Sequence, residues 1–170
     1  MAKNKADSKK KAAKKPRWVA VSGGFDPIHI GHTRMFNEAK KLGDKLVVIL
    51  NNDNWLCTKK GYAFMPENER KEVIEGLRAV DRVVLTCHTP NDPDRSVSRE
   101  LAKLKPTIFA NGGDRKNSND IPEGAVCKKH GIRMVFSVGK GGKVQSSSWL
   151  TANVKKQGNV DPKADKKVAV

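Results

Sequence analysis

The amino-acid sequence predicts an α/β fold, in which a single domain holds a five-stranded parallel sheet flanked by helices. Two observations carry this prediction. Short apolar runs alternate with longer amphipathic segments from about residue 18 to residue 154, as in chains that join parallel strands by crossover helices. Val, Ile and Leu dominate several of these runs, which is the composition of strands covered on both faces.

The predicted strands are five short apolar runs, each too short to form a buried helix. In chain order they are Trp18–Ser22, Leu46–Asn51, Arg82–Thr86, Thr107–Ala110 and Arg133–Ser137.

The predicted helices follow the strands one by one. They are Gly31–Leu42, Glu67–Val80, Ser96–Leu104, Pro122–His130 and Ser147–Val154. Pro66 and Pro122 stand where helices begin, which suits proline because the first helical N–H has no partner. Gly43 and Gly131 stand where helices are expected to end.

Strict alternation of strands and helices makes the domain Rossmann-like, with right-handed crossovers. Ligands of such sheets bind beyond the carboxyl ends of the strands, near the point where the strand order reverses. The predicted domain covers residues 18–154, and the remaining residues form two tails.

The formal net charge of +16 is spread unevenly along the chain. Residues 1–17 carry eight Lys or Arg against one Asp, and residues 155–170 carry five Lys against two Asp. Because neither segment has apolar periodicity, we expect two disordered basic tails. Weak polyanion contact and a nuclear address remain open for the first tail, but a solvated tail is favoured.

Other classes of protein are disfavoured by composition. The three cysteines lie 30 and 40 positions apart, without the spacing of a zinc site or a disulfide framework. No apolar run is long enough for a membrane span, and no apolar core follows the first lysines as in a secretory signal. We therefore expect a cytoplasmic protein with no membrane association.

The most informative segment is residues 23–32, Gly-Gly-Phe-Asp-Pro-Ile-His-Ile-Gly-His, between the first strand and the first helix. Backbone N–H groups at a helix start bind anions, because they point outward at the positive end of the helix dipole. Two imidazoles, His29 and His32, lie at this start. The combination suits a phosphate site, and specifically the stabilisation of charge that develops on a phosphate.

Two further groups of charged residues follow the second strand. Lys59 is expected in a loop, from which its ammonium could reach a phosphate or remain a solvated surface charge. Arg70 and Arg78 are eight residues apart in one predicted helix, so both guanidinium groups are expected on one helix face. They could clamp phosphates or pair with neighbours such as Glu75.

Two later turns complete the predicted sheet edge. Residues 109–115, Phe-Ala-Asn-Gly-Gly-Asp-Arg, form a strand that enters a glycine turn, where a nucleotide base or ribose could be read. Residues 140–148, Lys-Gly-Gly-Lys-Val-Gln-Ser-Ser-Ser, place three hydroxyls at a helix start. An ordinary left-handed turn and simple helix capping are the alternatives for these two segments.

In this order, the segments resemble the cytidylyltransferase-like family of nucleotidylyltransferases, whose signature is His-x-Gly-His. The resemblance runs from about residue 18 to residue 150. The members of the family that the chain resembles are glycerol-3-phosphate cytidylyltransferase and the adenylyltransferase domain that makes ADP-heptose. Asn111–Asp114 resembles the Lys-Gly-Gly-Asp turn of the heptose enzyme. Gly141 stands where the cytidylyltransferase pattern has an arginine, so Lys140 or Lys143 would supply that charge.

The resemblance implies an enzyme that transfers CMP or AMP from CTP or ATP to a small phosphorylated alcohol or sugar, releasing pyrophosphate. It also implies a homodimer and a bound Mg²⁺ ion. Asp26 and Asp114 are candidate contributors to the Mg²⁺ site, and no residue is assigned as a metal ligand. The implied catalytic residues are His29, His32, Lys59, Arg70 and Arg78. The implied nucleotide-binding residues are Gly24, Phe25, Asp26, Gly31, Asn111, Gly113, Asp114, Lys143, Ser146, Ser147 and Ser148.

Two other functions fit parts of the sequence. Class I aminoacyl-tRNA synthetases share the His-Ile-Gly-His tetrapeptide, but 170 residues without a Lys-Met-Ser-Lys-Ser-like segment are too few for such an enzyme. A non-catalytic nucleotide sensor, holding nucleic acid through its basic tails, remains the alternative. Aromatic residues are absent from the chain before Trp18, which disfavours base stacking by the first tail.

Overall fold

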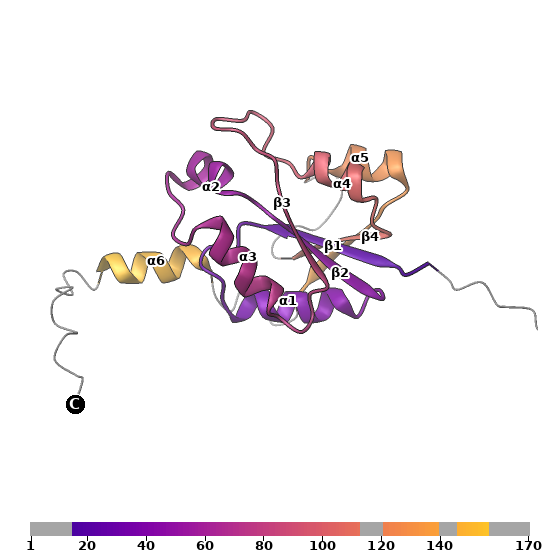
Figure 1. The fold of residues 1–170 in the computed structure, drawn as a ribbon, viewed down its shortest axis with the longest axis horizontal. Coiled ribbons are helices and arrows are strands. Elements are labelled where there is room, and N and C mark those ends of the chain that lie inside the picture. The colour runs from indigo at the N-terminus through magenta and orange to yellow at the C-terminus, as the bar shows by residue number, and fades with distance from the viewer. Residues whose placement is uncertain (1–14, 113–120, 140–145, 157–170) are drawn as a thin grey trace, which may run out of the picture.

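The computed structural model describes residues 15–112, 121–139 and 146–156. The five strands of these ranges are parallel and form one sheet, as predicted, and their order in the sheet is β3-β2-β1-β4-β5 (Figure 1). The strands are β1 Trp18–Gly23, β2 Lys45–Leu50, β3 Arg82–Leu85, β4 Ile108–Gly112 and β5 Arg133–Val138. The order reverses direction between β1 and β4, so the ligand crevice of this fold class opens at the carboxyl ends of these two strands.

Helices cover both faces of the sheet (Figure 1). Their bounds are α1 Ile30–Lys40, α2 Asp53–Lys60, α3 Glu67–Glu75, α4 Ser98–Leu104, α5 Gly124–His130 and α6 Ser147–Lys156. None of the helices within the described ranges is long and apolar enough to cross a membrane.

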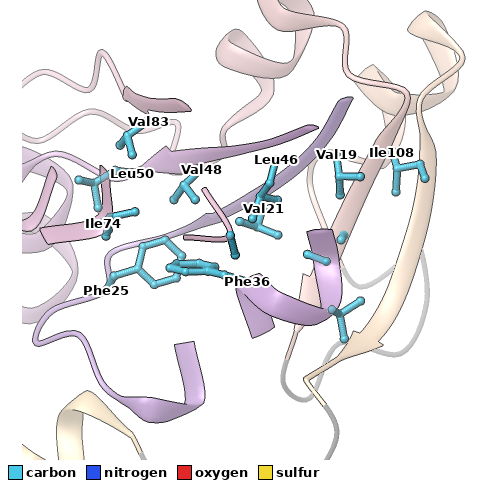
Figure 2. Close-up of a cluster of buried hydrophobic side chains, with 14 residues drawn as sticks. Val19, Val21, Phe25, Phe36, Leu46, Val48, Leu50, Ile74, Val83 and Ile108 are labelled. Atoms are coloured by element: carbon cyan, nitrogen blue, oxygen red, sulfur yellow. The ribbon is translucent and has the colours of Figure 1, made fainter. Parts of the chain in front are cut away.

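Alternate residues of the strands enter two separate cores, because successive side chains of a strand point to opposite faces. On one face, Val19, Val21 and Val48 pack against α1 and α3 (Figure 2). On the other face, Ala20 and Val47 pack against α4 and α5. Burial of both faces explains the nearly continuous apolar runs from which the strands were predicted.

Helix α2 was not predicted, and the segment that contains Lys59 is therefore not a loop. The cap residues of α2 were visible in the sequence. The side chain of Asn52 accepts a hydrogen bond from the N–H of Trp55, as an N-cap does, and Gly61 ends the helix in a left-handed conformation with φ of 85°.

Helix α3 ends at Glu75, five residues before the predicted end, and this overturns the shared helix face of Arg70 and Arg78. After Gly76 the chain turns back toward the start of β3. Asp81 fixes this return because its carboxylate accepts from the N–H of Leu46 at 2.7 Å. Arg78 is exposed in this turn, on the side of the sheet where the strands begin and away from their carboxyl ends.

Several other predicted boundaries differ by one or two residues; for example, α4 begins at Ser98, two residues after the predicted Ser96. Helix α5 begins at Gly124, two residues beyond Pro122, and α6 continues to Lys156. Gly43 lies beyond the C-cap of α1, where a Cβ would lie 2.6 Å from the carbonyl oxygen of Arg17, so close backbone approach accounts for the glycine. Most of the predicted tails, residues 1–14 and 157–170, lies outside the described residues.

Candidate active site

The turn after β1 is held by close packing. A Cβ on Gly24 would lie 2.7 Å from a methyl group of the buried Leu56, so a larger residue here requires the Leu56 side chain to shift. Phe25 is buried with φ of 48°, a left-handed conformation that is uncommon for an aromatic residue. Its ring contacts the ring of Phe36 edge to face at a centroid distance of 5.0 Å (Figure 2). The same ring contacts that of His32 edge to face at 4.9 Å. These contacts hold the strained backbone of Phe25 in place and fix the position of the His32 ring.

His29 and His32 cap helix α1 with their own rings. Nδ1 of His29 accepts from the N–H of Gly31 at 3.1 Å, and Nδ1 of His32 accepts from the N–H of His29 at 3.3 Å. The rings stack with centroids 3.7 Å apart. An Nδ1 that accepts a hydrogen bond carries no proton, so a neutral ring is protonated at Nε2. Each ring therefore keeps its Nε2–H as a donor, because capping uses only the Nδ1 acceptor.

Both imidazoles are neutral at physiological pH. Burial lowers the pKa of His29. Burial, then the charge of His29, then the charge of Lys60 lower the pKa of His32 to about 3. A neutral pair donates hydrogen bonds to a phosphate without the mutual repulsion of two imidazolium rings.

Asp26 lies in the turn but its carboxylate points to protein backbone. Its two oxygens accept from the N–H groups of Phe64 and Met65, at 2.8 and 2.7 Å, and the side chain is buried. The predicted nucleotide contact and metal contribution of Asp26 are therefore not the role that this geometry favours. Asp26 instead fastens the loop between α2 and α3 to the turn between β1 and α1.

Arg70 is fully buried and binds protein oxygens in place of the predicted phosphate clamp. Its partners are the carbonyl oxygens of Met65 at 2.8 Å, Gly24 at 2.6 Å and Asn51 at 2.8 Å, and the carboxylate of Asp53. Of the residues that hold these acceptors, Gly24 follows β1 and Asn51 follows β2. Asp53 begins α2, and Met65 precedes α3. Arg70 is therefore a positioning residue that joins four segments around the carboxyl ends of the strands.

Lys59 and Lys60 occupy the last turn of α2 and point to different places. The ammonium of Lys59 lies 4.5 Å from the ring centre of Trp55. The ammonium of Lys60 donates to the carbonyl oxygen of Asp26 at 3.0 Å. The sequence predicted a role for Lys59 and none for Lys60. The two side chains point in different directions because α2 is a helix, and the sequence did not predict this helix.

Helix α6 brings its N-terminus to the same turn. The hydroxyl of Ser146 accepts from the N–H of Trp149 at 3.2 Å, and the hydroxyl of Ser147 donates to the carbonyl oxygen of Pro27 at 2.9 Å. Ser148 is exposed in the first turn of this helix. Two helix N-termini, those of α1 and α6, thus lie beside the histidines, and both favour an anion.

The remaining predicted nucleotide residues lie at β4 or beyond it. Asn111 is buried at the end of β4. A Cβ on Gly112, the next residue, would lie 2.6 Å from the sulfur of Met35 in α1. Gly113, Asp114 and Lys143 are outside the described residues, and their predicted contacts stay predictions.

The segment between β3 and α4, residues 86–97, forms the wall beyond α2. Two amides of α2, from Asn52 and Asn54, donate to the carbonyl oxygen of His88 at 2.8 and 3.0 Å. The indole of Trp55 donates to the carbonyl oxygen of Arg95 at 2.8 Å. In the sequence, residues 88–95 of this wall fit neither of the two enzymes that the chain resembles, and the resemblance places the acceptor substrate there. That placement stays a prediction.

Three comparisons identify similar proteins. The chain matches the Cytidylyltransferase-like family over residues 20–136. The FAD synthase of Ferroglobus placidus is 38% identical over 97 residues, which are 57% of this chain and 59% of that protein. The bifunctional protein HldE of Hahella chejuensis is 42% identical over 98 residues, which are 56% of this chain and 19% of that protein. The match thus covers less than two thirds of either relative.

A solved structure agrees in fold as well as sequence. The crystal structure of the lipopolysaccharide core biosynthesis protein from Thermoplasma volcanium aligns with a TM-score of 0.58 and 30% identity, covering 72% of this chain and 94% of that chain. The family match extends from β1 into β5 and includes the glycine-histidine turn, α2 and Arg70. The resemblance inferred from the sequence is confirmed, and the chain belongs to the Cytidylyltransferase-like family.

Proposed function

We propose that the protein is a nucleotidylyltransferase that transfers AMP from ATP to the phosphate of an acceptor and releases pyrophosphate. The observation that carries this proposal is the pair of neutral histidines at the N-terminus of α1, each with an Nε2–H donor. The FAD synthase and HldE relatives favour AMP transfer over the CMP transfer that the sequence left open.

The proposed reaction needs no covalent intermediate with the protein. An acceptor phosphate oxygen attacks the α-phosphorus in line, and the bond from that phosphorus to the leaving pyrophosphate oxygen breaks. The Nε2–H groups of His29 and His32 donate to phosphate oxygens as negative charge develops on them. Because the rings are already fixed by capping and stacking, little reorganisation accompanies the reaction.

Mg²⁺ is proposed to arrive with the nucleotide. Asp26 does not fit a metal ligand, since both of its oxygens accept backbone N–H groups. Within residues 15–112, 121–139 and 146–156, no three His, Cys, Asp or Glu residues lie close enough together to hold a metal ion. The residues thus favour an ion bound mainly by phosphates, as Mg²⁺ commonly is.

The acceptor is proposed to bind between α2 and residues 86–97. Trp55 and Lys59 stand there as a half-buried aromatic ring beside an exposed ammonium. A ring and a cation suit an acceptor that combines a planar group with a phosphate, and FAD synthase relatives support FMN as the first candidate. The HldE relative supports a sugar phosphate as the second candidate.

The experiment is a matrix of nucleotides and acceptors, with pyrophosphate release as the measurement. ATP and CTP are each combined with FMN, heptose phosphate or glycerol 3-phosphate in the presence of Mg²⁺. Pyrophosphate release with ATP and one of the first two acceptors is the expected result. If ATP stabilises the folded protein against heat but no pair releases pyrophosphate, the protein is a nucleotide sensor and not an enzyme. Deletion of residues 1–17 would then test whether the tail holds nucleic acid.

A further inference from the structure

His88 is a buried histidine in the wall formed by residues 86–97, and the proposed reaction does not use its ring. Nε2 of the ring lies 3.1 Å from the carbonyl oxygen of Ser96, and Nδ1 lies 2.8 Å from the hydroxyl of Thr86. Because a carbonyl oxygen only accepts hydrogen bonds, Nε2 carries a proton and donates it to Ser96. In the neutral ring Nδ1 accepts from Thr86, whose oxygen in turn accepts from the N–H of Asn52 at 3.0 Å.

The hydrogen bonds of His88 form a closed series around Trp55 of α2. The carbonyl oxygen of His88 accepts from the amide of Asn52 at 2.8 Å, and the same amide group accepts from the N–H of Trp55 at 3.0 Å. On the other side, the indole of Trp55 donates to the carbonyl oxygen of Arg95 at 2.8 Å. Arg95 directly precedes Ser96, which accepts from the ring of His88. The backbone and the indole of Trp55 are thus both joined to His88, through different partners.

The carbonyl that holds the indole is itself fixed in orientation. The C=O of Arg95 and the N–H of Ser96 belong to one planar peptide group, and this N–H donates to the carboxylate of Asp94 at 2.9 Å. In the next peptide group, the N–H of Val97 donates to the buried carboxylate of Glu123 at 3.1 Å, and the C=O accepts from the buried imidazole. Two successive peptide groups are therefore held on both sides.

The Trp55 ring lies where two parts of the site meet. A Cβ on Gly24, in the turn after β1, would lie 3.6 Å from a carbon of this ring. The ammonium of Lys59 lies 4.5 Å from the ring centre, and the indole N–H reaches the wall. The half-buried ring thus stands between the proposed nucleotide turn and residues 86–97, where an acceptor would approach the nucleotide.

We propose that His88 is a positioning residue for acceptor binding, which holds the Trp55 indole in the orientation that contacts the acceptor. This inference rests on the proposed function, and it gives His88 no contact with either substrate. Acceptor affinity then scales with the fraction of molecules whose indole has the binding orientation. Nucleotide affinity does not depend on that fraction, because the proposed phosphate contacts come from the turn before α1.

The test compares three substitutions in the full-length protein. His88→Leu removes both ring nitrogens, whereas His88→Gln retains an N–H donor near the place of Nε2. Thr86→Val removes the hydroxyl that bonds Nδ1 and keeps the side-chain volume. The matched control is His130→Leu, at a half-buried histidine that ends α5.

Two readouts separate positioning from a merely structural role. Pyrophosphate release gives kcat and the KM values for ATP and for two acceptors, FMN and heptose phosphate. Nitrogen-proton NMR gives the hydrogen exchange rate of the Trp55 indole N–H, whose resonance is assigned by its loss in Trp55→Phe. Circular dichroism confirms that each variant is folded.

His88→Leu is expected to raise the acceptor KM about 5- to 10-fold, the population equivalent of one hydrogen bond, and to speed indole exchange by a similar factor. The ATP KM and kcat change less than about twofold, since only ground-state acceptor binding is altered. His88→Gln restores the acceptor KM to within about twofold of the wild type because its amide donates in place of Nε2–H. Thr86→Val shifts both readouts in the same direction as His88→Leu, and His130→Leu matches the wild type.

Three results would overturn the inference while leaving the proposed function intact. One is a folded His88→Leu variant whose acceptor KM or indole exchange is unchanged. Another is an ATP KM that rises as much as the acceptor KM, which marks general loosening of the site. If His88→Leu does not fold, unchanged readouts in Thr86→Val are the third. Wild-type protein that releases no pyrophosphate with either acceptor would overturn the proposed function, and indole exchange would still show whether His88 holds the ring.

Discussion

Replacement of Arg70 by methionine tests the structural core of the site. The buried guanidinium donates to three carbonyl oxygens and to the carboxylate of Asp53, and all four acceptors lose their donor in Arg70→Met. Removing one partner of a buried ion pair costs about 3–5 kcal/mol of stability, and the lower end of about 3 kcal/mol applies here because the Asp53 side chain is 36% exposed. For a domain of this size, that corresponds to a fall in melting temperature of roughly 10 °C.

The assay is equilibrium unfolding in urea at 25 °C, monitored by circular dichroism. Arg78→Met is the matched control because Arg78 is exposed in the turn after α3, and surface substitutions usually change stability by less than about 0.5 kcal/mol. Arg70→Met is expected to remain folded, since domains commonly have about 5–15 kcal/mol of stability. An Arg70→Met change below about 1 kcal/mol, or an equal change for Arg78→Met, would refute the assignment of Arg70 as the residue that joins the site.

Three further predictions concern the turn and its pH dependence. His32→Ala lowers kcat roughly 10²–10³-fold, the scale for loss of one preorganised donor, and steady-state kinetics check it against unchanged circular dichroism. Gly24→Ala, with its Cβ 2.7 Å from Leu56, costs about 1–3 kcal/mol in urea unfolding, and a neutral result would show that this contact relaxes freely. The lowered pKa of His32 makes the unfolding free energy decrease as pH falls from 6.5 toward 3, because protons then favour the unfolded chain. His32→Gln should flatten that decrease in unfolding experiments between pH 7 and 4, and an unchanged slope would contradict the assignment.

The sheet was predictable from sequence because its signal is local. Both faces of β1 and β2 are buried, so their apolar runs are nearly uninterrupted, and only their order in the sheet had to come from the structure. The glycine-histidine turn was predictable for the same reason, since its capping contacts span only three residues.

The contacts that the sequence did not predict at the site join residues that are distant in sequence. Arg70 carried the pattern of a phosphate-binding residue, but its acceptors lie as many as 46 positions away at Gly24. Asp26 likewise reaches backbone 39 positions away at Met65, which no local pattern announces. Helix α2 was missed for a different reason. Its cap residues, Asn52 and Gly61, can be read from the sequence, but its apolar periodicity is too weak to indicate a helix between them.

The most direct test of the central claim is the identity of the product. Wild-type protein is incubated with Mg·ATP and FMN or heptose phosphate, and the acceptor is analysed by mass spectrometry and ³¹P NMR. Nucleotidylyl transfer predicts an acceptor that has gained AMP through a new diphosphate bond, with the amount falling roughly 10²-fold or more in His32→Ala. An acceptor that gains a single phosphate, or ATP hydrolysed without transfer and equally fast in His32→Ala, would contradict the reaction assigned to the two histidines.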